Sequence, residues 1–453
     1  MEQESTMTHE EVVEELRNRL KPGGVHTIDT ILTGILQEEF QAIDPEEMAL
    51  VDRLGEHYRA NYSSSKGRIE YDRVSLGYAL HYMPPYYAKI QNMFLELFRN
   101  DLLPEHMKIL DVGAGTGSAV FAAVNFFSTL SEVLTQFGER REFNLEIQLV
   151  ERSGRNIEIF RQLWTKYKQK WSEVEDLWGG AFTAENVTVK KPKQDEVKPD
   201  IKIARKSYKT SDMVLFSHFL NEISGDKINI LHEFMQVVKD DGSFVIIEPA
   251  DKHGTKLVSH VRMFKKDLGW YVYSPCAIWH PFCSSQHEYT GDCAFCAISK
   301  PDIQPVRYNR RRSKTDMKYA YAILRQDGEH THLGRPDEEY TKFSELHRIP
   351  NLPVRNVHVR AIKQREKNFV TRRIQGQDLH GASYYVCDGT SGRAHTQLVA
   401  LGSKQRVIDN ADDGDILDIQ NAYAARAPSE DKWCIYEIIA TEQSNVRIIE
   451  NTL

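Results

Sequence analysis

The spacing of apolar and polar positions divides the chain into three regions with different periods. In residues 1–105, apolar residues recur every three or four positions, as in EEVVEELRNRL and IDTILTGILQEEFQAI, which predicts amphipathic helices. The segment GYALHYMPPYYAKIQNMFLELFRNDL predicts a helix that is broken at Pro84 and Pro85 and then continues toward Leu103. The first region is therefore expected to be an N-terminal helical region.

In residues 106–330, short apolar runs alternate with helical segments. Strands are expected at KIL before the glycines, LEIQLVE, SDMVLFSHFL, GSFVIIEP, LGWYVYSP and MKYAYAILRQ. Helices are expected at IEIFRQLWTKYKQKW and DKINILHEFMQVV. Alternating strands and helices predict an α/β fold with a parallel, doubly wound sheet.

From residue 350 to residue 453 the period is mostly two. The segments NVHVRAIKQ, FVTRRIQG, SYYVCDG, AHTQLVAL, DILDIQNAY and CIYEIIAT are short expected strands with turn residues between them. They predict a small all-β domain, a five-stranded barrel similar to an OB-fold.

Composition and charge narrow the class of protein. A chain of 453 residues suggests two or three domains, and its net charge of −7 gives no overall attraction to nucleic acid. Basic stretches nevertheless occur at Lys190–Lys209, Arg307–Lys318 and Arg355–Arg373. No apolar run reaches the length of a membrane span, and the acidic start is unlike a targeting peptide, so we expect a cytoplasmic protein with no membrane partner.

A glycine-rich turn follows the first expected strand of the α/β region. Asp111 ends this strand, and Gly113, Gly115 and Gly117 follow before a helix. Glycines let the backbone turn tightly and let a ligand approach without a Cβ clash. The next strand ends at Glu151, where an acid can accept hydrogen bonds from both ribose hydroxyls of a nucleoside. This pattern, with no phosphate-binding lysine, predicts a class I S-adenosylmethionine site; the alternative is a turn that keeps the fold without the cofactor.

The methyl acceptor does not follow from the sequence. The end of the third expected strand and the two residues after it read Ser217-His218-Phe219-Leu220-Asn221-Glu222 and lack the Asn/Asp-Pro-Pro-aromatic motif of base amine methyltransferases. His218 is a candidate general base, with a packing role as the alternative.

Four of the six cysteines lie close together, in the expected loop 274–300. Cys276, Cys283, Cys293 and Cys296 have the spacing C-x6-C-x9-C-x2-C. Such a set can hold zinc or a [4Fe–4S] cluster, and the spacing does not choose between them. Cys387 and Cys434 are expected to pack in the β-domain.

Together these segments resemble the methyltransferase-like family of mitochondrial small-ribosomal-subunit assembly factors and their prokaryotic relatives. The resemblance covers about residues 50–326. It is carried by three segments: Tyr78 to Ala88 with its Met83-Pro84 and Tyr86-Tyr87 pairs, Leu110 to Ser118, and Ser274 to Cys276. It implies a [4Fe–4S] cluster on the four cysteines and action on small-subunit ribosomal RNA or its assembly. Trp279, His280 and Pro281 within the loop, and the C-terminal β-domain, depart from the family pattern.

The β-domain carries candidate contacts for single-stranded RNA. Barrels of this kind hold strands by stacking bases on aromatic rings over a basic groove. The basic candidates share one segment of the domain: Arg355, Arg360, Lys363, Arg365, Lys367, Arg372 and Arg373. Phe369, Tyr384 and Tyr423 are the candidate platforms. The alternative is a protein-docking barrel with these aromatic rings in its core.

The leading hypothesis is an S-adenosylmethionine-binding protein that acts on the small ribosomal subunit, as a methyltransferase or as an assembly factor on a methyltransferase scaffold. A protein methyltransferase and a non-catalytic RNA-binding module with a structural metal cluster are the alternatives.

Overall fold

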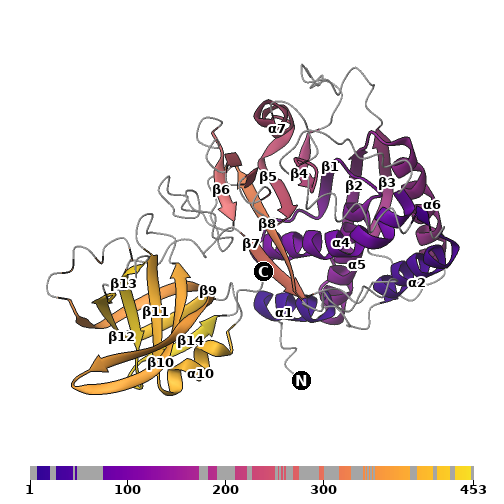
Figure 1. The fold of residues 1–453 in the computed structure, drawn as a ribbon. Helices are drawn as coiled ribbons and strands as arrows, with labels where there is room; N and C mark the ends of the chain where they lie inside the picture. The colour runs from indigo at the N-terminus through magenta and orange to yellow at the C-terminus, as the bar shows by residue number, and fades with distance from the viewer. Residues whose placement is uncertain are drawn as a thin grey trace, which may run out of the picture. The chain divides into compact units, whose positions relative to one another are not determined.

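The computed structural model divides the chain into two compact units, residues 1–248 with 298–319 and residues 249–297 with 320–453. It describes residues 8–20, 27–43, 46–47, 75–172, 182–190, 210–221, 227–249, 254, 257–258, 260–261, 269–274, 295–299, 316–327, 340–341, 343, 346, 349, 352–387, 395–411, 416–428 and 434–449. Figure 1 shows the arrangement of helices and strands.

A large sheet of eight strands forms the centre of the α/β region. Its strands are β1 (His106–Val112), β2 (Phe143–Val150), β3 (Phe182–Lys190), β4 (Ser211–Ser217), β5 (Val238–Pro249), β6 (Tyr271–Ser274), β7 (Phe295–Ser299) and β8 (Asp316–Arg325). Their order is β3-β2-β1-β4-β5-β8-β6, with β7 paired to β8. β1 to β5 pair in parallel, and β6 pairs antiparallel with β8. This is the strand order of a class I methyltransferase sheet, as the sequence predicts, although β3 and β7 were not expected.

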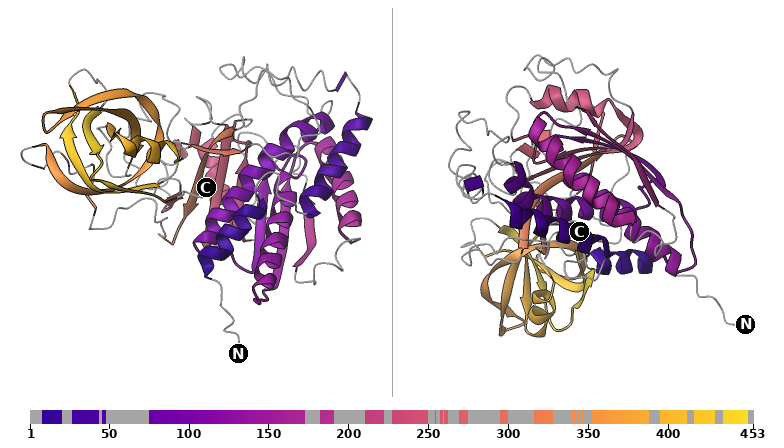
Figure 2. Two further views of the ribbon diagram at one scale, coloured as in Figure 1. Left: turned by 90° about the horizontal axis from the view of Figure 1, so that it is seen from below. Right: turned by 90° about the vertical axis from the view of Figure 1, so that its right-hand side faces the viewer.

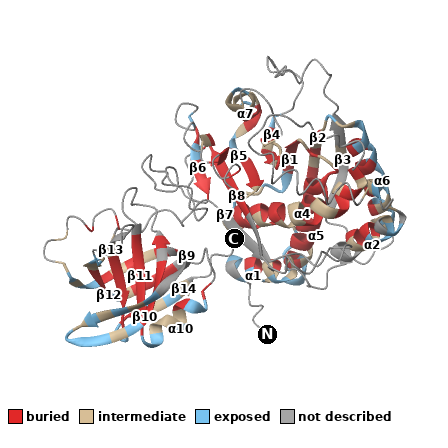
Figure 3. Ribbon diagram, viewed as in Figure 1, coloured by how far each residue is buried: buried red, intermediate tan, exposed pale blue. Residues whose placement is uncertain are grey.

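Helices of the first unit pack on one another and on this sheet. They are α1 (His9–Leu20), α2 (Thr27–Ala42), α4 (Ser75–Arg99), α5 (Ser118–Gln136), α6 (Gly154–Ser172) and α7 (Lys227–Met235). α5 contacts α4, α1, β2 and β3, and α2 lies against α6 (Figure 2). Figure 3 shows that buried residues concentrate along the sheet strands and α5.

α4 is one continuous helix, so the predicted break at Pro84 and Pro85 is wrong. A proline inside a helix removes a hydrogen bond and costs about 3 kcal/mol. Here Leu80, Met83 and Tyr87 are all buried around the prolines. Burying such side chains contributes about 1.5–3 kcal/mol each, which offsets that cost.

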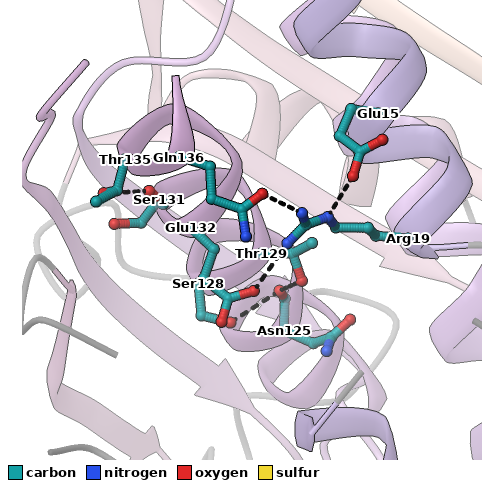
Figure 4. A network of polar contacts seen from close by, with 9 residues as sticks. All are labelled: Glu15, Arg19, Asn125, Ser128, Thr129, Ser131, Glu132, Thr135 and Gln136. Atoms are coloured by element: carbon teal, nitrogen blue, oxygen red, sulfur yellow. Dashed lines mark hydrogen bonds and ion pairs between the residues drawn. The ribbon is translucent and has the colours of Figure 1, made fainter. Parts of the chain in front are cut away.

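Arg19 fixes α1 to α5, as Figure 4 shows. Its Nε donates to Glu15 Oε1 at 2.8 Å, and its guanidinium also donates to Glu132 Oε2 at 3.4 Å and to Gln136. Because Glu132 and Gln136 are one turn apart on α5, a single arginine sets the register of the two helices.

α5 is long and apolar enough to cross a membrane by length and composition, contrary to the expectation that no such run exists. However, 83% of its apolar window is buried inside the protein. Within the described residues, this is the pattern of a core helix that faces other helices on one side and a sheet on the other.

A second sheet of six strands lies in the second unit. Its strands are β9 (Val354–Ile374), β10 (Gln377–Cys387), β11 (His395–Leu401), β12 (Ile416–Arg426), β13 (Cys434–Ala440) and β14 (Asn445–Ile449), with helix α10 (Ser403–Asp409) after β11. The order is β13-β11-β10-β9-β12-β14, and β13 also pairs with β12. The pairing path through five strands therefore returns to its start, and β14 adds a sixth.

β9 is a single strand of 21 residues, where the sequence analysis expected two. Its two ends face different partners: the first part pairs with β12 and the rest with β10. β9 continues through the charged residues in its middle because it forms a ladder with β10, in which the register shifts twice.

Candidate functional site

The glycine-rich turn joins β1 to α5 at the carboxyl end of the parallel strands. Gly113, Gly115 and Gly117 all have positive φ angles, of 76°, 56° and 89°. The N–H groups of Gly113 and Ala114 donate to Val150 O at 2.9 and 3.2 Å, which ties the turn to the end of β2. Backbone conformations of this kind favour glycine, so the local sequence dictates the turn.

The three glycines differ in what surrounds them. A Cβ on Gly113 would lie 2.3 Å from the Phe219 ring, and a Cβ on Gly117 would lie 2.2 Å from the Phe160 ring. A Cβ on Gly115 would meet no heavy atom within 4 Å among the described residues. Gly113 and Gly117 are therefore explained by packing, whereas Gly115 has open space beside its backbone.

Glu151 follows β2 directly and turns back toward this space. Its Oε2 accepts the N–H of Gly115 at 2.8 Å, and its Oε1 accepts the N–H of Ser153 at 2.6 Å. Burial raises the pKa of Glu151, while the N–H groups of Ser153 and Gly115 act in the opposite direction. The structure thus brings together two of the predicted cofactor residues, Gly115 and Glu151.

Asp111 is a second acid at this end of the sheet. Its neighbours in the sheet are Leu149 on β2 and Leu215 on β4, and only 2% of the residue is exposed. Burial, with a smaller effect of the Glu151 charge, raises the pKa of Asp111 to about 8. Asp111 is therefore protonated at neutral pH in the absence of a ligand.

The segment after β4 forms the neighbouring wall of the glycine turn. Glu248, at the end of β5, accepts the N–H of Leu220 at 2.9 Å through Oε1 and the side-chain amide of Asn221 through Oε2. Lys227 Nζ donates to Leu220 O at 2.5 Å. These contacts hold the segment that includes His218 and Phe219 in one conformation.

His218 is buried and contacts α4, a link that the sequence does not reveal. Its ring stacks on Tyr86 with centroids 3.9 Å apart and planes at 12°. Its Nε2 lies 3.1 Å from Lys89 Nζ. Tyr86 and Lys89 are one turn apart on α4, so the helix before the sheet supplies both partners.

The cysteine prediction falls outside the described structure. Cys276, Cys283 and Cys293 lie outside the described residues, and Cys296 is on β7, of whose side chains nothing is described. Within the described residues, no group of three or more His, Cys, Asp or Glu side chains is placed to hold a metal ion.

Several predicted RNA contacts are committed to the β-domain itself. Tyr384 is fully buried and its hydroxyl donates to Asp409 at 2.5 Å, so the prediction of a stacking platform there is wrong. Lys363 is buried and donates to the carbonyls of Ile408 and Ala411, so its predicted phosphate contact is also wrong.

Arginine side chains of the same segment are engaged to different degrees. Arg372 Nε donates to both carboxylate oxygens of Glu437, at 3.1 and 2.9 Å. The guanidinium of Arg360 lies 4.7 Å from the Tyr340 ring centroid, and that of Arg355 lies 5.5 Å from the ring of Tyr423.

Exposed groups remain near the β9–β10 turn. Phe369 is 79% exposed, an unusual position for a large apolar side chain. The Arg373 side chain is 74% exposed, and its ion pair with Asp378 is long, at 4.0 Å. By contrast, Tyr423 is buried in a small core cluster with Val399, Leu401 and Ile439, so the prediction of a stacking platform there is wrong. The side chains of Arg365 and Lys367 are outside the described set.

Residues 149–385 match the sequence model of the family described as mitochondrial small ribosomal subunit Rsm22. This span is more than half of the chain. The chain belongs to the Rsm22 family. Membership confirms the resemblance drawn from the glycine turn, the helix before it and the cysteine loop. The match also extends into the β-domain, as far as Tyr385 in β10.

The solved structures similar to this Rsm22 family member share little sequence identity with it. Aeropyrum pernix fibrillarin with natively bound S-adenosyl-L-methionine is 12% identical, covering 53% of this chain and 76% of its own, with a TM-score of 0.28. A TehB-like SAM-dependent methyltransferase from Corynebacterium glutamicum is 12% identical, covering 55% and 97%, with a TM-score of 0.29. A replication factor A related protein from Methanobacterium thermoautotrophicum is 13% identical, covering 25% and 94%, with a TM-score of 0.19. No curated protein matches the chain at a significant level.

Proposed function

We propose that this protein binds S-adenosylmethionine and acts on the small ribosomal subunit or its RNA, as a methyltransferase or as an assembly factor on a methyltransferase scaffold. The observation that carries the proposal is the Glu151 carboxylate held beside the open backbone of Gly115. Membership of the Rsm22 family supports the small-subunit part of the proposal.

The chemistry of the site fits this cofactor. A ribose presents two hydroxyl donors, and Glu151 is an acceptor at the end of β2. Open space at Gly115 allows a nucleoside to lie against the backbone. Asp111 offers a second carboxyl group, whose ionised form a positive charge on the methionine part would favour. When bound, the cofactor supplies an electrophilic methyl group.

Calorimetry with S-adenosylmethionine and its demethylated product tests the binding site. Glu151→Gln should weaken binding at least 10-fold, because a neutral amide is a poorer acceptor for two hydroxyls. Glu146→Gln is the matched control on the same strand, since Glu146 lies inside β2, five residues before Glu151, and pairs with Lys108 at 3.5 Å. Folded wild-type protein that binds neither ligand contradicts the proposal.

The ribosomal part is tested separately. Tagged protein should co-sediment with small ribosomal subunits or their precursors, and crosslinking in cells should map to small-subunit RNA. Crosslinks confined to proteins would favour a protein methyltransferase. Ribosomal association without any cofactor binding would favour a non-catalytic RNA-binding module.

For the C-terminal domain we propose an OB-fold that binds single-stranded RNA. Supporting this, the pairing order β9-β10-β11-β13-β12 returns to β9, β11 and β13 are parallel, and α10 lies between the third and fourth strands. The exposed Phe369 and Arg373 supply a platform and a charge that are open to solvent.

For the four cysteines we propose a [4Fe–4S] cluster, with zinc as the alternative. The support is the spacing of Cys276, Cys283, Cys293 and Cys296 in a chain with no other close set of thiols. Four thiolates suit either metal group, so iron, sulfide and zinc analysis of anaerobically purified protein decides between them.

A further inference from the structure

His218 has an unusual backbone conformation for its residue type. Its φ of 56° lies in the left-handed region, and its N–H donates to Ile247 O at 2.7 Å. A non-glycine residue there is strained and is retained mostly where the surrounding structure holds it in place. Glu248 and its contacts with the residues after His218 hold this conformation.

The His218 ring has one partnered nitrogen and one buried nitrogen that has no partner among the described residues. Nε2 contacts Lys89 Nζ, whereas Nδ1 makes no hydrogen bond to any described residue. His218 is 93% buried, since 7% of it is exposed. A buried polar atom without a partner is destabilising, and a histidine that serves only to pack would avoid this by rotating or by pairing.

Lys89 lies among groups that leave its charge poorly compensated. It is 6% exposed, and the rings of Tyr86 and Tyr319 lie 5.1 and 5.8 Å from its Nζ. Burial lowers the pKa of Lys89 to about 7, although the Glu248 charge raises it. Burial, and the charge of Lys89, lower the pKa of His218 well below its usual range. His218 is therefore neutral near pH 7, while Lys89 changes charge there.

These two groups are coupled through one hydrogen bond. A charged Lys89 has only donors, so Nε2 must accept and the single ring proton sits on Nδ1. A neutral Lys89 has a lone pair, so Nε2–H can donate to it and Nδ1 becomes a free acceptor. The charge of Lys89 thus decides whether the unpartnered nitrogen of His218 is a donor or a base.

We propose that Lys89 and His218 form a proton relay for the methyl acceptor, with Nδ1 of His218 as the base and Lys89 as the final proton holder. The proposal rests on the proposed function, which supplies a sulfonium methyl donor. The acceptor oxygen forms a bond to the methyl carbon, and the S–C bond breaks with its electron pair passing to sulfur. The acceptor proton goes to Nδ1, and the Nε2 proton passes to Lys89.

The relay indicates a hydroxyl acceptor, such as a ribose 2′-hydroxyl of RNA. A hydroxyl must lose its proton as the oxygen attacks, whereas an amine can attack through its lone pair and lose the proton afterwards. A base already aligned with a second group is therefore most useful to a hydroxyl.

The relay has a signature that does not depend on methyl transfer. In full-length protein labelled with ¹⁵N-histidine, the signal missing from His218→Asn belongs to His218, and asparagine tolerates the left-handed backbone. We expect the His218 tautomer to switch near pH 7 in the wild type and not in Lys89→Met. A tautomer that stays constant from pH 5.5 to 8.5 overturns the relay, whatever the protein binds.

Methyl transfer to unmodified, transcribed small-subunit RNA completes the test, with calorimetry of the same samples. His218→Asn and Lys89→Met should bind S-adenosylmethionine like the wild type but transfer methyl groups about 10²- to 10⁴-fold more slowly. The wild-type rate should rise with pH through about 7, a rise that Lys89→Met loses. His232→Asn is the control, since His232 is half-buried on α7 and, among the described residues, its ring lies 2.9 Å from the Gln236 side-chain amide.

The outcomes separate the two proposals. Wild-type protein that does not bind the methyl donor contradicts the proposed function. The pH dependence of the His218 tautomer then still tests the relay. A wild type that binds the donor overturns the relay if it transfers no methyl group, or if His218→Asn transfers at the wild-type rate. A 2′-O-methyl group blocks alkaline cleavage of the RNA on the 3′ side of the modified nucleotide. If alkali cleaves the methylated RNA at that position, the hydroxyl assignment is overturned.

Discussion

Replacing Asp111 by asparagine should stabilise the protein without ligand while it weakens cofactor binding. Asp111 is 2% exposed between Leu149 and Leu215, and its pKa is raised to about 8. In the unfolded chain the carboxyl group ionises near pH 3.8, so at pH 7 the folded state alone holds the proton.

The size of the effect follows from that difference. For each pH unit above the unfolded pKa, keeping Asp111 protonated in the folded state lowers the free energy of unfolding by about 1.36 kcal/mol. At pH 7, about three units above that pKa, the loss is roughly 4 kcal/mol. Asparagine is neutral and almost the same shape, so it avoids this cost. Its second N–H group offsets part of the gain if it finds no acceptor. We therefore expect Asp111→Asn to raise the free energy of unfolding by about 1–3 kcal/mol at pH 7.

The sign of the pH dependence makes the prediction specific. Between pH 4 and 8 Asp111 holds its proton in the folded state and loses it in the unfolded state, so the contribution of Asp111 to wild-type stability falls as pH rises. The advantage of Asp111→Asn should be small at pH 4 and grow toward pH 8 in urea unfolding experiments. Asp212→Asn is the control, because Asp212 accepts the N–H of Lys108 at 2.8 Å and pairs with Lys239, so this change should destabilise. An Asp111→Asn protein that is less stable than the wild type at pH 7 would refute the reasoning.

Three further predictions concern the turn, the cysteine loop and the β-domain. Gly115→Ala should weaken S-adenosylmethionine binding at least 10-fold in calorimetry. Gly138→Ala is the control, because Gly138 also has a positive φ and open space beside it, so it should lose the same folding free energy of about 1 kcal/mol and leave binding unchanged. Equal binding by the two variants would argue against a ligand at Gly115. Cys293→Ser should lower metal content and melting temperature together, and wild-type values for both would exclude a metal site there. Phe369→Ala should weaken single-stranded RNA binding by about 1–3 kcal/mol with little change in salt dependence, whereas Arg373→Ala should make the dependence less steep. RNA binding that neither change alters would place the contact elsewhere.

The methyltransferase-like sheet could be predicted because its signals are local. The glycines directly follow the buried strand that contains Asp111, and their spacing alone places the turn at the carboxyl end of β1. The strand β3 was missed because FTAENVTVK mixes polar and apolar residues without a clear run, and it becomes a strand through its pairing with β2.

The partners of His218 could not be predicted, because Lys89 lies 129 residues away in the sequence. Nothing in the pattern of α4 marks one lysine among apolar positions as a partner for a segment after β4. By contrast, the error at Tyr384 was avoidable. Period two places Tyr384 on the same face of β10 as Ala382 and Val386, which are both core residues.

The position of β8 in the large sheet has a consequence for synthesis on the ribosome. β8 is the last of these strands to be made, yet it lies between β5 and β6 in the sheet order. At about 5–20 residues per second, the chain needs on the order of 4–15 seconds to advance from the end of β5 to the end of β8. During that interval the nascent chain carries an unpaired strand edge, which is the kind of surface that attracts other strands. A separate peptide with the β8 sequence should therefore compete for this edge. Chaperone binding to nascent chains should be greatest before residue 325 emerges from the ribosome.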